Sequence, residues 1–142
     1  MNRLLFLVPV LLLGSIPLAC PADETAKEKT VSFRKDIKPI LKEKCVHCHN
    51  RKTLPGRVSF ESAKLAFGKN AQGKEFIVPG KAEQSLIIQS LTAPVFHEKA
   101  MPMVGPRPTK KDIEMLRRWI SQGAEWPKGL AGTIRPTFIP KE

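Results

Sequence analysis

The sequence has 142 residues, a length that accommodates one ordinary domain once a targeting segment is set aside. Lysine and arginine number 24 against 13 aspartates and glutamates, which gives a formal net charge of +11 at pH 7. Such a chain attracts acidic partners, but it carries no recognised nucleic-acid-binding motif, so we expect no nucleic acid among its ligands. With no tyrosine and 6% aromatic residues, it would form a thin core unless a bound group supplied apolar surface.

Residues 1–22 predict a secretory signal peptide. Arg3 precedes an apolar run over residues 4–13, which is too short for a membrane span, and small and proline-containing residues follow. The order Leu-Ala-Cys that ends at Cys20 resembles a bacterial lipoprotein signal, although Pro17 stands where that pattern prefers a large aliphatic residue. Two outcomes stay open: lipidation of Cys20 anchors the chain to a membrane, whereas cleavage after Ala22 discards this cysteine.

The remaining chain divides into three parts. Residues 23–31 are mostly polar and have no periodicity, which predicts a flexible tether. We expect the domain proper over residues 32–126. The tail, residues 127–142, has prolines and sparse apolar side chains, so it should either wrap over the surface or remain loose.

The central motif is Cys45-Val46-His47-Cys48-His49. Two cysteines separated by two residues, with a histidine directly after the second, are typical of c-type haem attachment. Residues three and four apart share one face of a helical turn, so Cys45 and Cys48 can each form a thioether while His49 points at the iron. His49 is the candidate proximal ligand of this covalently bound haem.

Other chemistries use similar spacings. A Cys-x-x-Cys pair also forms half of a zinc site or a thioredoxin-like redox pair, and His47 and His49 could complete a metal shell. Zinc would require a second ligand pair downstream, where His97 stands alone, and a redox pair would require a βαβ pattern. We therefore favour haem and interpret His47 as a surface residue.

Four segments predict helices. The first begins at the cap Ser32 and should be kinked or broken at Lys38, because Pro39 interrupts it before Cys45. The second opens at Ser59 and is closed by Gly68. The other two run from Ser85 to Leu91, stopped by Pro94, and from Thr109 to Gln122, with a capping-box pattern at Thr109 and Asp112 and a stop at Gly123.

The segment Val95–Pro108 is rich in proline and lacks periodicity, which predicts a rigid loop. Such a loop can hold one side chain against a metal, and a thioether favours ferrous iron. Met101 is our candidate for the distal ligand because it directly precedes a proline, with Met103 second and His97 third. The alternative is that these methionines only fill space around the haem.

These pieces together resemble the planctomycete-type cytochrome c domain, a family of class I cytochromes c. The resemblance runs from about Phe33 to Ala124, and it rests on the motif at residues 45–49, the turn at 78–80 with 85–87 after it, the step Met101-Pro102 and the segment 116–124. It implies an all-α fold, class I cytochrome c-like, in which several short helices wrap around one covalently bound haem. Thioethers at Cys45 and Cys48 and axial ligands His49 and Met101 would hold that haem. The family commonly has Met-Pro-Pro, whereas Met103 follows Pro102 here, so Met101 and Met103 both stay candidates for the distal position.

The predicted function is that of an electron carrier without enzymatic activity. With both axial positions filled, the iron of an exported single-haem cytochrome c would exchange electrons with redox partner proteins, and the basic surface could steer acidic partners toward it. Two alternatives stay open: a haem enzyme or a gas or peroxide sensor with a displaceable distal ligand, and a fixed electron-transfer subunit of a membrane-associated complex. The signal predicts a periplasmic protein, or one anchored through Cys20 to the outer side of the cytoplasmic membrane.

Overall fold

The computed structural model describes residues 29–53 and 57–136. The predicted signal peptide, Cys20, most of the tether and the end of the tail lie outside the described residues. Among the residues that the structure describes, no helix is long and apolar enough to cross a membrane.

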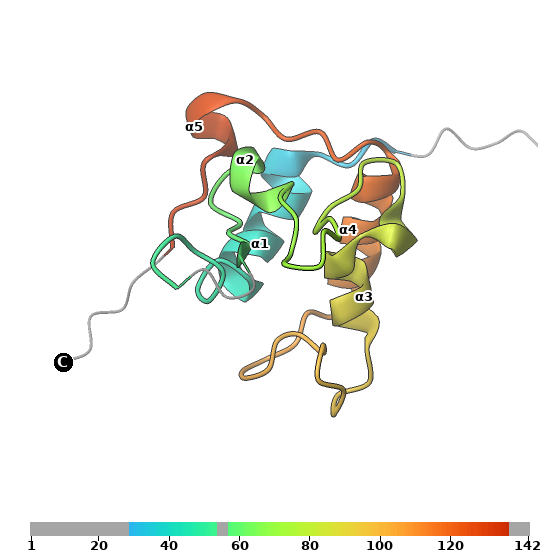
Figure 1. Cartoon of the computed structure of the whole chain (residues 1–142). Helices are drawn as coiled ribbons and strands as arrows, with labels where there is room; N and C mark the ends of the chain where they lie inside the picture. Colours follow the sequence, from blue (N-terminus) through green and yellow to red (C-terminus); the bar gives the residue numbers. More distant parts are fainter. Residues whose placement is uncertain (1–28, 54–56, 137–142) are drawn as a thin grey trace, which may run out of the picture.

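The described residues form short helices joined by loops (Figure 1). Strand structure within them consists of an isolated antiparallel bridge between Lys69 and Glu75, so the helical part of the predicted fold class is confirmed. In chain order the elements are the π-helix η1 (Phe33–Ile37), α1 (Lys38–Lys44), α2 (Ala63–Ala66), the 3₁₀ helix η3 (Ala82–Gln84), α3 (Leu86–Thr92), α4 (Lys110–Ser121) and α5 (Gly129–Gly132).

The first helix changes type where the sequence predicted a break. Ser32 caps η1 by accepting a hydrogen bond from the backbone N–H of Lys35 at 3.3 Å. The π-helix passes into α1 at Lys38, whose N–H bonds the Phe33 carbonyl, and Pro39, which has no N–H to donate, stands in the first turn of α1. The apolar face stays continuous across the change, since Phe33, Ile37 and Leu41 are all buried.

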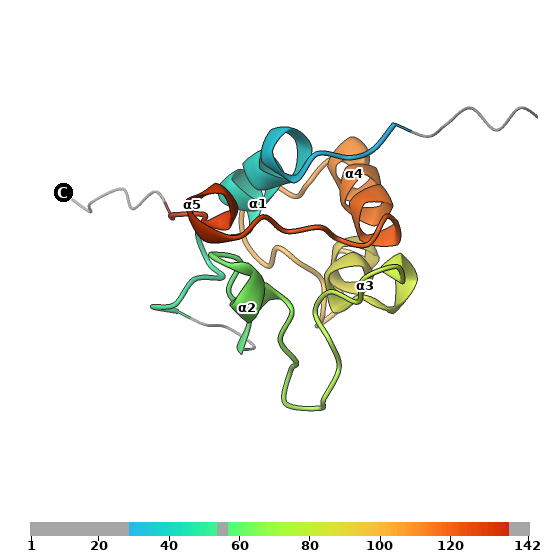
Figure 2. The same ribbon diagram turned by 90° about the horizontal axis from the view of Figure 1, so that it is seen from above.

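Helix α4 packs against η1, η3 and α3 and forms the longest wall of the core (Figures 1 and 2). The capping box is present: the Thr109 hydroxyl accepts from the N–H of Asp112 at 3.1 Å, and the Asp112 carboxylate accepts from the N–H of Thr109 at 2.8 Å. Leu116, Trp119 and Ile120 are buried on its inner face. The helix predicted over residues 109–122 is therefore confirmed, from its cap to its end before Gly123.

The second predicted helix begins later than expected. Helix α2 starts at Ala63 with Ser62 as its cap residue, whereas the sequence indicated a start at Ser59. Ser59 is fully buried, and its hydroxyl accepts from the backbone N–H of Glu61 and donates to the Glu61 carboxylate. Serine side chains that bond the backbone two residues ahead favour a turn over a helix, which delays the helix.

As far as residue 136, the C-terminal segment wraps over the domain. From α4 it returns past η1 to α5, which lies next to α2 in Figure 1 and next to α1 and α2 in Figure 2. Trp126 packs between Phe33 and Phe67, with ring centroids 4.5 and 6.1 Å away, and it lies 5.9 Å from Trp119. Ile134 is buried, and its N–H donates to the carbonyl of Glu61 at 2.9 Å.

Candidate haem site

The motif forms a turn that continues α1 past its last residue. The N–H of Cys45 bonds Leu41 at 3.1 Å, and the Cys45 carbonyl accepts from the N–H groups of Cys48 and His49 at 3.2 and 2.9 Å. The two thiols and the imidazole are therefore held by one turn of backbone, which follows α1 rather than lying inside it.

The two thiols are both free, but their surroundings differ. Cys45 belongs to the hydrophobic core, with 7% of its surface exposed, whereas Cys48 is exposed. Burial, with a smaller contribution from nearby Cys48, raises the pKa of the Cys45 thiol from 9.0 to about 12. Cys45 is thus an uncharged thiol at neutral pH.

His49 is half-buried and lies against Phe60, with ring centroids 5.6 Å apart and planes at 71°. The N–H of Phe60 donates to the His49 carbonyl at 3.0 Å, so this contact also closes the loop between them. His47 is exposed, as the sequence indicated for a residue inside the cysteine pair.

Asn50 is a residue that sequence reasoning did not single out. Its side chain is buried, with 1% exposed, and it lies directly after the motif. The amide Nδ2 donates to the carbonyls of Val46 and His47 at 3.1 and 2.8 Å, and Oδ1 accepts from the N–H groups of Lys52 and Thr53 at 3.0 and 3.3 Å. Nothing in the sequence around Asn50 distinguishes it from an ordinary loop residue, so these hydrogen bonds could not be predicted.

The three candidate distal ligands lie in one loop but in different environments. Met101 is half-buried against the core, and its N–H donates to the Ser90 carbonyl on α3 at 3.0 Å. Met103 has 78% of its surface exposed. His97 is exposed, and its Nδ1 accepts from the N–H of Lys99 at 3.1 Å.

Arg107 fixes the base of this loop and was also missed from the sequence. Its guanidinium donates to the carbonyls of Leu91 and Ala93 at 3.1 and 3.3 Å. These carbonyls stand at the end of α3, where the helix leaves its last acceptors without intrahelical partners. The bonds close the loop between Ala93 and Arg107, so that its two ends are held together.

The loop also exposes much apolar surface. The large apolar side chains exposed among the described residues are Val95, Phe96, Met103, Val104 and Leu130, and all except Leu130 belong to this loop. Concentrations of exposed apolar side chains are typical of surfaces that bind a partner or an apolar ligand. A porphyrin would be one such ligand.

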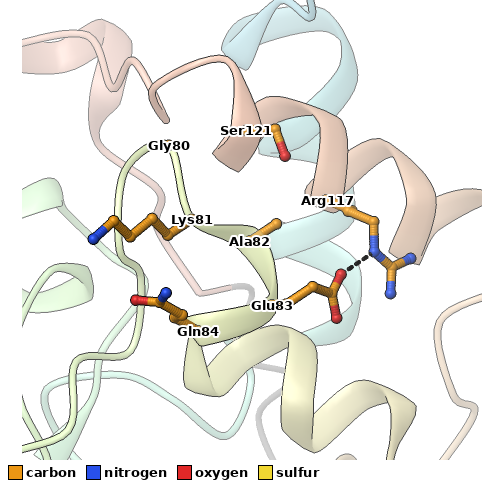
Figure 3. Close-up of a pocket in the computed structure, with 7 residues that line it drawn as sticks. All are labelled: Gly80, Lys81, Ala82, Glu83, Gln84, Arg117 and Ser121. Atoms are coloured by element: carbon orange, nitrogen blue, oxygen red, sulfur yellow. Dashed lines mark hydrogen bonds and ion pairs between the residues drawn. The ribbon is translucent and has the colours of Figure 1, made fainter.

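Two cavities lie away from the motif. One of about 300 Å³ is lined by Gly80, residues 81–84, Arg117 and Ser121, and Figure 3 shows that Arg117 there points toward Glu83. The guanidinium of Arg117 is already paired with Glu83 at 2.5 Å and with Glu114 at 3.1 Å. This hollow is therefore a structural junction between η3 and α4 rather than part of the motif.

The donor set fits a haem c. Two free thiols suit thioether formation, an imidazole suits iron, and a thioether suits the second axial position. Among the described residues, no group of three or more His, Cys, Asp or Glu side chains could hold a metal ion by itself.

Short helices and a turn with two thiols and an imidazole are typical of c-type cytochromes. Residues 45–102 match the family model described as Planctomycete cytochrome C, which confirms the resemblance seen in the motifs. Over this segment the chain is similar to planctomycete-type cytochrome c domains, a family that implies binding of haem c. The match begins at Cys45 and ends at Pro102, directly after Met101.

A curated relative and a solved structure are also similar to the chain. Hydrazine synthase subunit alpha from Kuenenia stuttgartiensis is 28% identical over 143 aligned residues, which cover 81% of this chain and 18% of the relative. A solved structure of Kuenenia stuttgartiensis hydrazine synthase matches with a TM-score of 0.47 and 26% identity, over 80% of this chain and 18% of that chain. The chain therefore spans about a fifth of the length of the curated relative that it matches.

Proposed function

We propose that this protein is an exported c-type cytochrome that binds one haem covalently and passes single electrons between redox partners. The observation that carries the proposal is the matched segment itself, which starts at the first thiol of the motif and ends beside Met101. A bound haem c would supply one-electron chemistry; the residues of the chain hold it and control its surroundings.

Each site residue has a separate role in this proposal. Cys45 and Cys48 would hold the porphyrin through thioethers, and His49 would bind the iron. Met101 would be the second iron ligand, since among the three candidates it alone packs against the core and has a backbone bond to α3. An iron held by both residues would supply one-electron transfer.

A second candidate is an electron-transfer subunit fixed within an enzyme complex. The similarity to hydrazine synthase subunit alpha favours it, because that relative is by name a subunit of an enzyme and this chain matches a fraction of its length. Lipidation of Cys20 would hold such a subunit at a membrane. A free carrier exchanges electrons with a partner in a concentration-dependent reaction, whereas a fixed subunit co-purifies with its complex.

The basic composition supports an acidic redox partner for either candidate. Steering between exposed charges weakens as salt rises, because the Debye length falls from about 10 Å at 0.1 M to about 3 Å at 1 M ionic strength. The rate of electron exchange with an acidic partner should fall over this range. A rate that is indifferent to salt would argue against electrostatic steering.

The test of haem ligation compares Met101→Ala with Met103→Ala in protein matured with haem. Intact mass and the pyridine haemochrome spectrum establish attachment of one haem through both thiols. We expect a low-spin six-coordinate spectrum for the unmodified protein and for Met103→Ala, and loss of that spectrum with a lower reduction potential for Met101→Ala. A colourless protein with free thiols, or a high-spin spectrum before any substitution, would exclude the proposed carrier.

A further inference from the structure

Asn50 is one of three polar residues, with Ser59 and Ser85, that are buried in the described part of the chain. A primary amide offers two N–H donors and an acceptor oxygen with two lone pairs. All of these positions are filled, by the carbonyls of Val46 and His47 and by the N–H groups of Lys52 and Thr53. Such complete pairing offsets the cost of burying the amide.

The donors of Asn50 replace bonds that the helix no longer makes. In a continued α-helix, the carbonyls of Val46 and His47 would accept from the N–H groups of residues 50 and 51. Here the N–H of Asn50 bonds Cys48 at 3.2 Å, and the N–H of Arg51 bonds the Glu61 carboxylate at 2.6 Å. The side-chain Nδ2 of Asn50 serves both carbonyls instead.

These two carbonyls belong to the residues between the cysteines. The Asn50 amide therefore joins the inside of the motif to the chain that leaves it, and His49 stands between the bonded positions. We propose that Asn50 is a positioning residue, which holds the backbone turn so that the two thiols and the His49 imidazole are arranged for haem before it arrives. This inference rests on the proposed haem ligation.

One substitution separates the donating nitrogen of the Asn50 amide from its accepting oxygen, and a second serves as a control. Asn50→Asp keeps an acceptor for Lys52 and Thr53 but replaces the donating nitrogen with an oxygen that faces two carbonyls. Asn70→Ala is a matched control, because Oδ1 of Asn70 accepts from the N–H groups of Gln72 and Lys74 at 3.0 and 2.9 Å in a loop outside the motif. Both variants therefore lose an asparagine that orders a loop, but only Asn50→Asp changes a residue bonded to the motif.

The experiment measures the yield of attached haem, the low-spin electron paramagnetic resonance spectrum and the reduction potential, with thermal unfolding followed in parallel. We expect Asn50→Asp to lower the yield about tenfold and to change the spectrum and potential of the haem that does attach, as losses of groups that orient metal ligands do. Asn70→Ala should alter only the melting temperature.

Three results overturn the proposal. The first is an Asn50→Asp protein with normal yield, spectrum and potential, and the second is an equal effect of Asn70→Ala. The third is global unfolding of Asn50→Asp, which would assign Asn50 to the stability of the whole fold. Absence of haem from the unmodified protein would instead refute the proposed function, so the two failures are distinguishable.

Discussion

At the scale of single residues, the two thiols of the motif differ in reactivity although they are three positions apart. In haem-free protein, iodoacetamide should modify exposed Cys48 well before buried Cys45, whose raised pKa of about 12 keeps it protonated at pH 8. Peptide mapping by mass spectrometry after timed quenching measures both rates. In denaturant the two rates should converge, and equal rates in the folded chain would contradict the burial of Cys45.

The same thiol makes the stability of haem-free protein depend on alkaline pH. The pKa of Cys45 is about 12 in the folded chain against 9.0 ordinarily, so the folded state favours the protonated thiol. Its contribution is complete below pH 9 and is lost as pH rises toward 12, by up to roughly 4 kcal/mol. Urea titrations of the protein and of Cys45→Ala separate the contribution of this thiol to the free energy of unfolding from that of all other groups. A parallel pH dependence in both proteins would refute the assignment.

The sequence predicts that Cys45, Cys48 and His49 lie together because their spacing places them on one turn of backbone, and the structure confirms that turn. Their role as haem-binding residues stays a prediction. Asn50 and Arg107 could not be predicted, because their importance depends on where the backbone goes. The amide of Asn50 is needed at the motif because Arg51 bonds Glu61, ten positions further along. Arg107 matters because α3 ends within its reach, sixteen positions earlier.

At the scale of elements, the capping box of α4 is the clearest local signal in the chain. Thr109→Ala removes the side-chain acceptor for the N–H of Asp112 and should lower the free energy of unfolding by about 1 kcal/mol. Thr30→Ala, at an exposed position outside the helices, is the control and should have little effect. Chemical denaturation monitored by circular dichroism measures both, and equal effects would contradict the capping role.

Helix α5 depends on a close approach of two backbone segments. A Cβ atom at Gly132 would lie 1.8 Å from the carbonyl oxygen of Pro127, so Gly132→Ala must displace backbone. We expect a loss of stability of about 1–3 kcal/mol, as for other overpacked sites. Ala131→Ser changes the exposed neighbouring position and should be nearly neutral. A stable Gly132→Ala protein with unchanged Trp126 fluorescence would contradict this packing.

Helices with their own start and stop signals could be predicted, and those governed by distant contacts could not. Helix α4 has its cap, apolar stripe and terminating glycine within one stretch of sequence. Helix α2 is preceded by a turn that depends on Ser59 being buried against Glu61. The N–H of Ile134, from the C-terminal segment, donates to the carbonyl of Glu61. No periodicity within residues 59–67 carries that information.

At the scale of the whole molecule, Trp126 links the two ends of the domain. Its ring contacts Phe33, Phe67 and Trp119, and its indole N–H donates to the Gly132 carbonyl at 2.7 Å. Trp126→Ala should therefore lower the free energy of unfolding by about 3 kcal/mol.

Phe96→Ala provides the contrast to Trp126→Ala. Phe96 is fully exposed in the loop between α3 and α4, so its removal should change the stability of haem-free protein by less than about 0.5 kcal/mol. Denaturant titrations of the two variants give the comparison. A comparable loss in both proteins would show that the aromatic cluster does not join the ends of the chain.

The helical class and the positions of η1 with α1, α3 and α4 could be predicted from the sequence, because periodicity and breakers specify them, whereas η3 and α5 could not. The return of the C-terminal segment was left open between wrapping and looseness. It is decided by single long-range contacts, such as Lys38 Nζ donating to the Ala131 carbonyl at 3.0 Å, which leave no periodic trace.

The placement of Trp126 and Ile134 against the first helix bears on how the protein matures. Ribosomes make the chain from its N-terminus, so Phe33 and the thiols of residues 45 and 48 are synthesised well before the residues that close over Phe33. Until those residues are in place, the buried cluster that contains Cys45 lacks Trp119, Ile120 and Ile134. We therefore expect that any enzyme that joined porphyrin to Cys45 would act before the C-terminal segment packs against the domain.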